Sequence, residues 1–374
     1  MSTKKKVDRV IFHVDMDSFY ASCEMARNPS LKEGSFIVGA DPKEGRGRGV
    51  VLSCNYIARK IGIHSGMPIS QAWKLCPNGT YVPPHHEMYG EVSRRIIDIL
   101  KQFSTRVEQV SIDEAYLDFS SDPSIAYLSS EDQEKAIKSI ATAIKNKVKS
   151  EEGITCSIGI SNSKLVAKIA TDFNKPDGLT LIRPQDIRQF LNPLPVEKIP
   201  GVGKVTQKIL LETFNVRSIL DLQKVPVEDL KEKFGRTGIW LHEVSLGNDD
   251  REVVNDWEPT SESGETTFEE DESDFTRIKD VMHEVATDVH KRTLIDGFLF
   301  RNVGIKIRFS GFETHTRSHM LPVPTDSLNV VLKECDDLLS EFSTAQKPVR
   351  LIGVRLASLE EKLGQGQKTL QEWS

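Results

Sequence analysis

The feature that most constrains the fold is the order of strand-like and helix-like segments in residues 10–160. Short apolar runs predict buried strands at 10–14, 107–111, 115–119 and 154–160. Apolar residues at helical spacing predict two helices, over 87–103 and over 130–148, the second with Ser130 as its N-cap. The order strand, helix, strand, strand, helix, strand is the split βαβ pattern of a ferredoxin-like sheet.

This order brings acidic residues from distant parts of the chain to one edge of the sheet. The first and third strands of the pattern are antiparallel neighbours, so the end of one meets the start of the other. Asp15 ends the first strand, and Asp113 and Glu114 open the third. Clustered carboxylates need cations to offset their repulsion, and oxygen ligands suit Mg²⁺. Solvated turn acids would explain either motif alone, whereas the two together favour a metal site.

The remaining segments indicate further domains. Residues 17–87 contain several turn signals and predict a small subdomain inserted over the sheet edge. Residues 178–248 are expected to be helical and compact. The stretch 251–274 contains ten acidic residues and one basic residue, and we expect the first part of this acidic region to be a linker. A second α/β domain is predicted from strands at 299–309 and 349–356 and helices at 278–294 and 328–342.

Length and composition limit the classes of protein to consider. A chain of 374 residues is too long for a single hydrophobic core, and no apolar run has the length of a membrane span. The basic N-terminus is followed by no signal-type apolar segment, which predicts a cytoplasmic protein. Five cysteines without metal-binding spacing predict reduced thiols. A net charge of −6 argues against simple coating of nucleic acid but allows a local basic groove.

Five motifs, in family order and spacing, resemble those of Y-family DNA polymerases, the class that includes bacterial polymerase IV, eukaryotic polymerase kappa and archaeal counterparts. They are Val-Asp-Met-Asp-Ser-Phe-Tyr-Ala at 14–21, Asn-Tyr-Ile-Ala-Arg-Lys at 55–60, Ser-Ile-Asp-Glu-Ala-Tyr-Leu-Asp at 111–118, Ser-Ile-Gly-Ile-Ser at 157–161 and Asn-Lys-Pro-Asp-Gly at 174–178. The similarity extends over residues 8–358. It implies a low-fidelity, template-directed translesion polymerase that extends a primer 3′ end by two-metal phosphoryl transfer.

The resemblance also implies an α+β, right-hand architecture. Its parts are a ferredoxin-like βαββαβ palm (1–18 and 85–182), small fingers (19–84), a helical thumb with a helix-hairpin-helix (183–248), a linker (249–262), an α/β little finger (263–359) and a tail (360–374). The expected cofactor is Mg²⁺, two ions per active site. The expected partners are primer–template DNA, deoxynucleoside triphosphates and a sliding clamp, with no membrane and a monomeric state.

Roles for single residues follow from the resemblance. Metal ligands are expected at Asp15, Asp113 and Glu114 and at the carbonyl of Met16. The nucleotide-binding residues are expected to be Ser18, Phe19, Tyr20, Ser53, Tyr56, Arg59 and Lys175. Tyr20 matches the steric gate against a ribose 2′-hydroxyl, and Val50 and Leu52 match the roof over the nascent base pair. Without the family pattern, Tyr20 would be a half-buried core tyrosine and Arg59 a surface cation.

Two further segments resemble DNA-binding parts of the family. Residues 200–204 resemble a helix-hairpin-helix turn, in which glycines let backbone N–H groups approach phosphate; a plain turn is the alternative. The basic strand 301–308 would provide a second grip, although a charged strand is more often a solvated face. The expected DNA-binding residues are Gly201, Gly203, Lys204, Arg301, Lys306, Arg308 and Arg317.

Two departures from the family pattern concern the little finger and the tail. Residues 260–263 lack the basic residue that the family commonly shows at this entry, which weakens the case for a phosphate contact there. The tail residues Gln367, Leu370 and Trp373 resemble a clamp-binding peptide, but its second aromatic residue is absent because Ser374 ends the sequence. An inert polar tail is the alternative.

Two other functions are compatible with the metal carboxylates or the fold. A nucleotide cyclase is also a two-metal enzyme on a split βαβ sheet, but it needs neither the hairpin at 200–204 nor a basic C-terminal domain. A non-catalytic DNA-binding scaffold would have no reason to keep the carboxylates. A template requirement separates the first from a polymerase, and primer extension with Mg²⁺ separates the second.

Overall fold

A computed structural model describes residues 9–126, 128, 130–255 and 258–362. The chain divides into two compact units, Met1–Trp257 and Glu258–Ser374, and each is described by itself. Within the described residues, no helix combines the length and the apolar character needed to cross a bilayer.

The first unit is built on a five-stranded sheet with the order β5-β6-β1-β7-β8. Its strands are β1 (Ile11–Met16), β5 (Val107–Gln109), β6 (Glu114–Asp118), β7 (Cys156–Ser161) and β8 (Leu179–Leu181). β1 lies between β6 and β7 and is antiparallel to both. The predicted neighbour relation of the first and third strands of the ferredoxin-like pattern is therefore confirmed. The short strand β8, which runs parallel to β7, was not predicted.

The sheet has one apolar face and one face that carries polar side chains. Three helices cover it, namely α4 (His86–Lys101), α6 (Ser130–Glu152) and α7 (Lys164–Phe173). Phe12 and Val14 are fully buried in the core that α4 and α6 complete. The alternate residues of β1, His13 and Asp15, lie on the other face, where His13 Nδ1 is 2.9 Å from Thr171 Oγ1 of α7. Alternation along one strand thus separates the core from the candidate chemistry.

Helix α7 packs closely on this second face because residue 159 is glycine. Gly159 of β7 pairs with His13. A Cβ atom at this position would lie 2.1 Å from the carbonyl oxygen of Ala167 and 2.3 Å from the nitrogen of Thr171. Both distances are far below van der Waals contact, so only glycine permits this approach of helix to strand.

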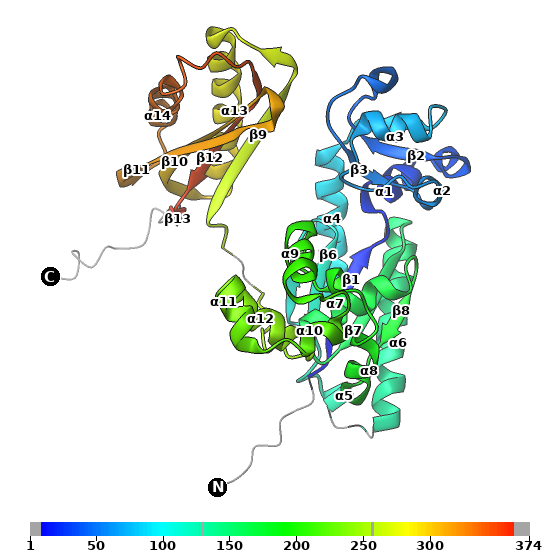
Figure 1. Ribbon diagram of the computed structural model, residues 1–374. Coiled ribbons are helices and arrows are strands. Elements are labelled where there is room, and N and C mark those ends of the chain that lie inside the picture. The colour runs from blue at the N-terminus through cyan, green and yellow to red at the C-terminus, as the bar shows by residue number, and fades with distance from the viewer. Residues whose placement is uncertain (1–8, 127, 129, 256–257, 363–374) are drawn as a thin grey trace, which may run out of the picture. The chain divides into compact units, whose positions relative to one another are not determined.

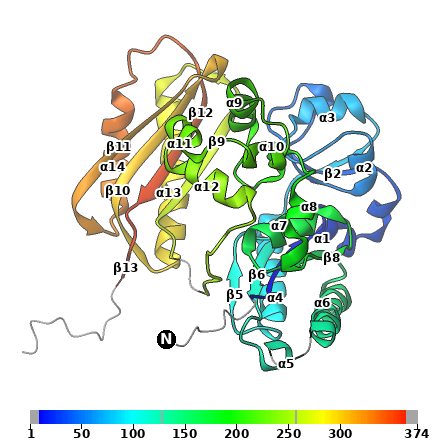
Figure 2. The same ribbon diagram turned by 60° about the horizontal axis from the view of Figure 1, so that its bottom comes forward.

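The segments expected to form the fingers (19–84) and the thumb (183–248) complete the first unit, and these names are kept for them below. The fingers comprise α1 (Phe19–Arg27), α2 (Tyr56–Lys60), α3 (Ile69–Leu75) and the sheet of β2 (Phe36–Gly39), β3 (Val51–Cys54) and β4 (Thr80–Val82). The thumb comprises α8 (Ile187–Leu191), α9 (Lys204–Phe214), α10 (Ile219–Gln223), α11 (Val227–Phe234) and α12 (Arg236–Ser245), and its core includes Leu165, Val166 and Ile169 of α7. The fingers and the short helix α5 (Pro123–Ala126) lie at opposite ends of this unit (Figures 1 and 2).

The segment 249–255 packs on the palm, which differs from the expected linker. Asp249 accepts a hydrogen bond from the N–H of Leu165 at 2.9 Å, and Asn255 accepts one from the N–H of Val107 at 3.0 Å. Val253 is buried against the sheet. The polar composition of this segment suggested a linker. Its polar side chains instead accept hydrogen bonds from backbone N–H groups at the start of α7 and in the edge strand β5.

The second unit is a four-stranded antiparallel sheet with the order β11-β10-β12-β9 and two helices. Its elements are β9 (Ser261–Glu272), α13 (Phe275–Ile295), β10 (Phe298–Phe309), β11 (Thr314–Thr325), α14 (Leu328–Ser340), β12 (Val349–Ala357) and β13 (Glu360–Glu361), the last paired with β10. The two central strands and both helices were predicted. β9 and β11 were not, because these edge strands are mostly polar and lack an apolar pattern.

Candidate active site

Three predicted metal ligands lie at the end of β1 and the start of β6. Asp15 and Glu114 are directly paired across the two strands. The N–H of Met16 donates to the carbonyl oxygen of Asp113 at 2.9 Å, which places the third carboxylate beside them. Asp113 Oδ1 also accepts a hydrogen bond from Ser111 Oγ at 2.6 Å. The topology therefore brings the distant acidic motifs together at one sheet edge.

Cations of the protein neutralise two of these carboxylates. Lys175 Nζ lies 2.9 Å from Asp15 Oδ1, and Lys168 Nζ lies 2.5 Å from Glu114 Oε2. His13 Nε2 is 3.3 Å from the same oxygen of Glu114. Within the part of the chain that the structure describes, no three His, Cys, Asp or Glu side chains are already gathered as a metal cluster. A metal ion would therefore take over charge that these lysines now balance.

The pKa values of these groups reflect burial and pairing. Burial raises the pKa of Asp15 to about 6, although the Lys175 ammonium opposes this shift. Burial also opposes ionisation of Glu114, but its contacts with His13 and Lys168 outweigh that effect and lower its pKa to about 2. Burial lowers the pKa of His13, although its contact with Glu114 opposes this shift. The pKa of Glu114 is therefore shifted in favour of the ionised form, whereas ionisation of Asp15 is opposed by burial and favoured by the nearby cation.

A cavity of about 220 Å³ opens beside the carboxylates. It is lined by Asp15, Met16, Ser18, Phe19, Tyr20, Leu52, Ser53, Tyr56, Arg59, Ser65, Ile112, Asp113 and Lys175. Among the described residues, the Ser18 Oγ and the Tyr56 hydroxyl are buried and lie close to each other, but neither forms a hydrogen bond of good geometry. Buried hydroxyls without a good hydrogen bond are costly, so a polar ligand in this cavity would relieve them.

Local structure explains how the cations and hydroxyls of the fingers reach this cavity. Asn55 accepts a hydrogen bond from the N–H of Ala58 at 3.0 Å, which caps α2 and starts the helix that carries Tyr56 and Arg59. The Arg59 guanidinium lies over the Tyr56 ring, 5.0 Å from its centroid. Ser53 Oγ of β3 is buried and accepts from the N–H of Ala21 at 3.4 Å, joining fingers to α1.

Tyr20 is held against a buried aromatic residue. Its ring stacks on that of Tyr89 with centroids 4.5 Å apart and an interplanar angle of 21°. Tyr89 is fully buried, and its hydroxyl donates to Glu24 Oε1 at 2.6 Å. Tyr20 therefore presents a braced ring to the cavity, so the expected sugar-gate role and the alternative of a half-buried core tyrosine are both compatible with its position.

The two predicted roof residues lie on or beside β3. Leu52 is half-buried and lines the cavity. Val50 directly precedes the strand and is 41% exposed, whereas Val51 between them is buried in the fingers core. Alternation along the strand thus separates the two residues from that core, on the side where a substrate could contact them.

The predicted helix-hairpin-helix turn has the expected backbone. Gly201 has a φ of 97°, which favours glycine, and Gly203 precedes the first turn of α9 without a side chain to cap it. Ile199 and Val202 are buried and fix the turn to the thumb core. Val205, the second residue of α9, is 75% exposed. The free N–H groups at the start of α9 and the exposed Lys204 face solvent together.

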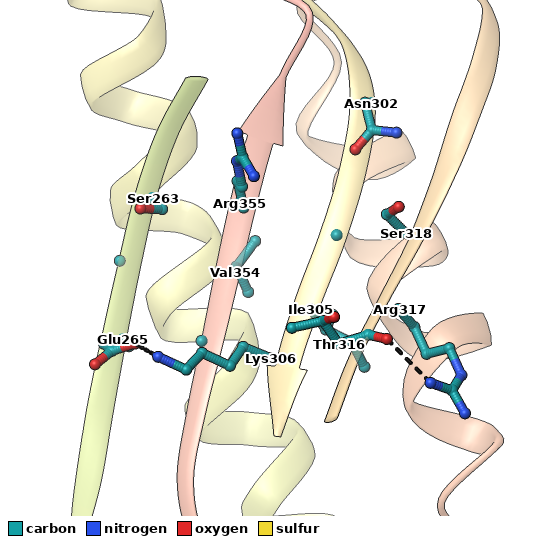
Figure 3. Close-up of a pocket in the computed structure, with 13 residues that line it drawn as sticks. Ser263, Glu265, Asn302, Ile305, Lys306, Thr316, Arg317, Ser318, Val354 and Arg355 are labelled. Atoms are coloured by element: carbon teal, nitrogen blue, oxygen red, sulfur yellow. Dashed lines mark hydrogen bonds and ion pairs between the residues drawn. The ribbon is translucent and has the colours of Figure 1, made fainter. Parts of the chain in front are cut away.

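The open face of the second unit is hollowed and polar. A shallow cavity of about 560 Å³ follows β9, β12, β10 and β11 on the side away from the helices (Figure 3). Lys306 Nζ reaches across Gly353 to Glu265 Oε2 at 2.6 Å. Arg308 Nε donates to Thr314 Oγ1 at 2.8 Å. Glycine and serine residues line the floor of this cavity, so an extended ligand could approach the sheet closely.

The other two basic residues predicted for this grip are engaged elsewhere in the second unit. Arg317 lines the cavity, but it pairs across the strands with the inward-facing Ile305, and its Nε lies 2.7 Å from Glu341 Oε2 beyond α14. Arg301 lies where the register of β10 shifts, and its Nε donates to the carbonyl oxygen of Leu321 at 3.0 Å. The sequence of basic residues did not show where the guanidinium groups of Arg301 and Arg317 point, because that depends on the register of the strands.

Three residues to which the sequence assigned no role contact or adjoin these sites. Arg355 of β12 is exposed on the open face next to Gly304. Lys168 pairs with Glu114, and Asp17 is buried behind the cavity. Only Asp17 left a sequence signal, its place in the first motif. The predicted clamp-binding residues Gln367, Leu370 and Trp373 lie outside the described residues.

Comparison with family models places three matching regions along the chain. The impB/mucB/samB family matches residues 14–172, the IMS family HHH motif matches 184–216, and the impB/mucB/samB family C-terminal domain matches 259–370. The second region contains the turn at 200–204, and the third contains the sheet of the second unit.

Several curated relatives and solved structures are similar over nearly their whole length. DNA polymerase IV of Methanoculleus marisnigri is 46% identical over 94% of this chain and 95% of its own. DNA polymerase IV 2 of Methanosarcina mazei is 42% identical over 95% and 93%. The Y-family DNA polymerase chimera Dbh-Dpo4(243-245)-Dbh has a TM-score of 0.83 at 26% identity, covering 94% of this chain and 99% of the chimera. An insertion ternary complex of Dbh DNA polymerase has a TM-score of 0.65 at the same identity, covering 94% and 99%.

Proposed function

This chain belongs to the impB/mucB/samB family of Y-family DNA polymerases, and from that premise we propose that its active site is the cavity beside Asp15. The protein is a template-directed, translesion DNA polymerase. One observation carries the assignment of the site. The pairing of Asp15 with Glu114 gathers distant carboxylates beside a cavity lined by Ser18 and Tyr56, whose buried hydroxyls form no hydrogen bond of good geometry.

Divalent metal dependence is general in this family, and we infer that the oxygen donors at the sheet edge would bind two Mg²⁺ ions. The proposed ligands are the carboxylates of Asp15, Asp113 and Glu114 and the carbonyl of Met16. All are hard oxygen donors, and the Lys175 ammonium beside Asp15 shows that the edge calls for positive charge. Two such ions, when bound, supply electrostatic stabilisation to the attacking primer 3′-oxygen and the leaving pyrophosphate.

The cations and N–H groups around the cavity suit a nucleoside triphosphate. Lys175 offers a compact charge and Arg59 a planar fork of donors, two complementary ways to bind phosphate. The N–H groups of Ser18 and Phe19 lie where α1 begins, and the helix dipole favours an anion there. The Tyr56 hydroxyl, which forms no hydrogen bond of good geometry within the protein, would donate one to a phosphate oxygen. Ser53, also lining the cavity, would add a further hydroxyl.

Residues on the apolar side of the cavity would select the sugar and the base pair. The Tyr20 ring, braced by Tyr89, would occupy the space that a ribose 2′-hydroxyl needs. Val50 and Leu52 would cover the nascent base pair from β3. These side chains are moderately bulky and would reduce the space above the base. The polymerase would therefore accept a narrower range of bulky lesions.

Two surfaces are proposed to hold the duplex. In the thumb, Gly201, Gly203 and Lys204 would bind phosphate mainly through backbone N–H groups, independently of sequence. In the second unit, the open sheet face would bind the backbone through Lys306, Arg308 and Arg355. Arg301 and Arg317 are not included in this surface, because the Arg301 guanidinium donates to the carbonyl oxygen of Leu321 and that of Arg317, which also lines the cavity, is directed to Glu341.

Replacement of Arg355 by alanine tests the open face. Within the described residues, Arg355 is exposed with no recorded ion pair, so it can bind phosphate without breaking an internal contact. We expect the slope of log affinity for primer–template DNA against log salt to fall by about 1 in R355A. K291A removes an exposed cation from α13, on the helix side, and should leave the slope unchanged. Equal slopes in wild type and R355A would remove this residue from the DNA-binding surface.

A primer-extension assay tests the proposed function as a whole. We expect extension in Mg²⁺ to follow the template base and to stop when EDTA is added. Extension without a template, or production of a cyclic nucleotide, would support the cyclase alternative instead. Neither the cyclase nor the non-catalytic scaffold is favoured by the comparisons, because the curated relatives are polymerases.

A further inference from the structure

The second aspartate of the first motif has a different environment from the first. Asp17 is only 2% exposed and does not line the cavity. Its Oδ1 accepts a hydrogen bond from Ser157 Oγ at 2.8 Å. Its Oδ2 accepts from Thr155 Oγ1 at 2.7 Å and from the backbone N–H of Asp177 at 2.8 Å. Both oxygens are therefore engaged by donors of the protein, which leaves Asp17 unsuited to metal binding.

The contact with Asp177 connects Asp17 to the loop that carries Lys175. The next N–H of this loop, that of Gly178, donates to Ser157 Oγ at 3.1 Å, so Asp17 and Ser157 hold two successive amides. On the opposite side, Lys145 of α6 contacts the carbonyl oxygens of Asp177 and Gly178. The loop is thus held from the sheet through its N–H groups and from α6 through its carbonyls.

The fixed loop determines where the Lys175 ammonium lies. Its Nζ is 2.9 Å from Asp15 Oδ1 and 2.9 Å from Asp172 Oδ1. Lys175 is two residues before the amide that Asp17 binds, so a shift of that amide would move the Lys175 backbone as well. Flexible lysine side chains reach many positions, and a fixed backbone is what limits them to one.

We propose that Asp17 is a positioning residue for nucleotide binding, which seats the loop at 174–178 so that Lys175 faces the triphosphate site. This inference rests on the proposed function of Lys175. The two carboxylates of the Asp-x-Asp motif would then have different roles: Asp15 would bind the metal ions, and Asp17 would hold the loop that carries Lys175. Asp17 itself contacts neither substrate nor metal.

The experiment measures binding of a matched deoxynucleoside triphosphate to the polymerase on a dideoxy-terminated primer–template, where no chemistry follows. We expect D17A to raise the Kd of the nucleotide by about tenfold, while the Kd of the primer–template stays within about twofold of wild type. D17N keeps a side-chain oxygen for the Asp177 amide and should recover most of the affinity. D221A is the matched control, because Asp221 also accepts hydrogen bonds from a hydroxyl and backbone amides, but at α10 in the thumb.

A double mutant separates positioning from general destabilisation. If Asp17 acts through Lys175, D17A/K175A binds the nucleotide no more weakly than K175A. Additive losses, or equal losses in D17A and D221A, would overturn the inference while leaving the role of Lys175 intact. If K175A alone leaves nucleotide affinity unchanged, the proposed role of Lys175 fails and the inference fails with it. Should D17A not fold, S157A carries the same comparison, since it removes the acceptor for the Gly178 amide.

Discussion

Replacement of Glu114 by alanine is expected to reduce primer extension by about 1000-fold or more, with duplex binding nearly unchanged. Glu114 is directly paired with Asp15, and its contacts with Lys168 and His13 keep it ionised. Removing one preorganised hydrogen-bond donor from a catalytic centre costs about 100- to 1000-fold, and loss of a carboxylate that binds the catalytic metal ions is expected to cost at least as much. The same loss is expected for D113A. Single-turnover extension at saturating nucleotide and Mg²⁺, beside an equilibrium DNA-binding titration, measures both quantities.

The matched control is E108A. Glu108 lies on β5 of the same sheet and also pairs with a lysine of α7, with Lys164 Nζ 2.6 Å from its Oε1. It does not line the cavity. E108A should therefore retain extension within a few-fold of wild type, whatever it costs in stability. Normal extension by purified E114A would contradict the proposed metal site, and equal loss in both variants would indicate a structural effect.

Replacement of Tyr20 by alanine is expected to increase incorporation of ribonucleotides relative to deoxynucleotides by about 100-fold or more. The ring is stacked on the buried Tyr89 and cannot easily move aside, so it would exclude a 2′-hydroxyl by volume. The ratio of kcat/KM for a ribonucleotide and its deoxy counterpart measures this discrimination.

The variant Y20F separates the ring from its hydroxyl. It keeps the stacked aromatic volume, so sugar discrimination should equal that of wild type. Discrimination that is unchanged in Y20A would remove Tyr20 from the gate role. Loss of discrimination in Y20F as well would show that the hydroxyl contributes and that a purely steric account is wrong.

The sequence predicted the palm because its strands and helices carry clear apolar periodicity. The antiparallel pairing of the strands that contain Asp15 and Glu114 followed from the order of elements alone and is confirmed. The strands β9 and β11 escaped prediction because each forms an edge of the second sheet and is mostly exposed. These segments form strands because they pair with β12 and β10, and their own residues carry no strand pattern.

The direction in which each side chain points also could not be predicted from the sequence. Arg301, Lys306, Arg308 and Arg317 were predicted to act together. Arg317 does line the cavity of the open face, but its guanidinium is directed to Glu341 at the end of α14. A one-residue difference in register decides which face a side chain occupies, and the sequence gives no measure of it. Lys168 was missed for a related reason, since its contact with Glu114 depends on how closely α7 lies on the sheet.

That closeness depends on the missing side chain at Gly159. A methyl group there would push α7 away from the sheet, because the carbonyl of Ala167 would lie 2.1 Å from it. Helix α7 carries Lys168, whose ammonium lies over Glu114, and Thr171, whose hydroxyl lies beside His13; it also supplies apolar residues to the thumb core. The absence of a side chain at a single backbone position therefore sets both the distance of Lys168 from Glu114 and the position of the apolar residues that α7 supplies to the helical core of residues 183–248. A change at Gly159 would disturb both at once.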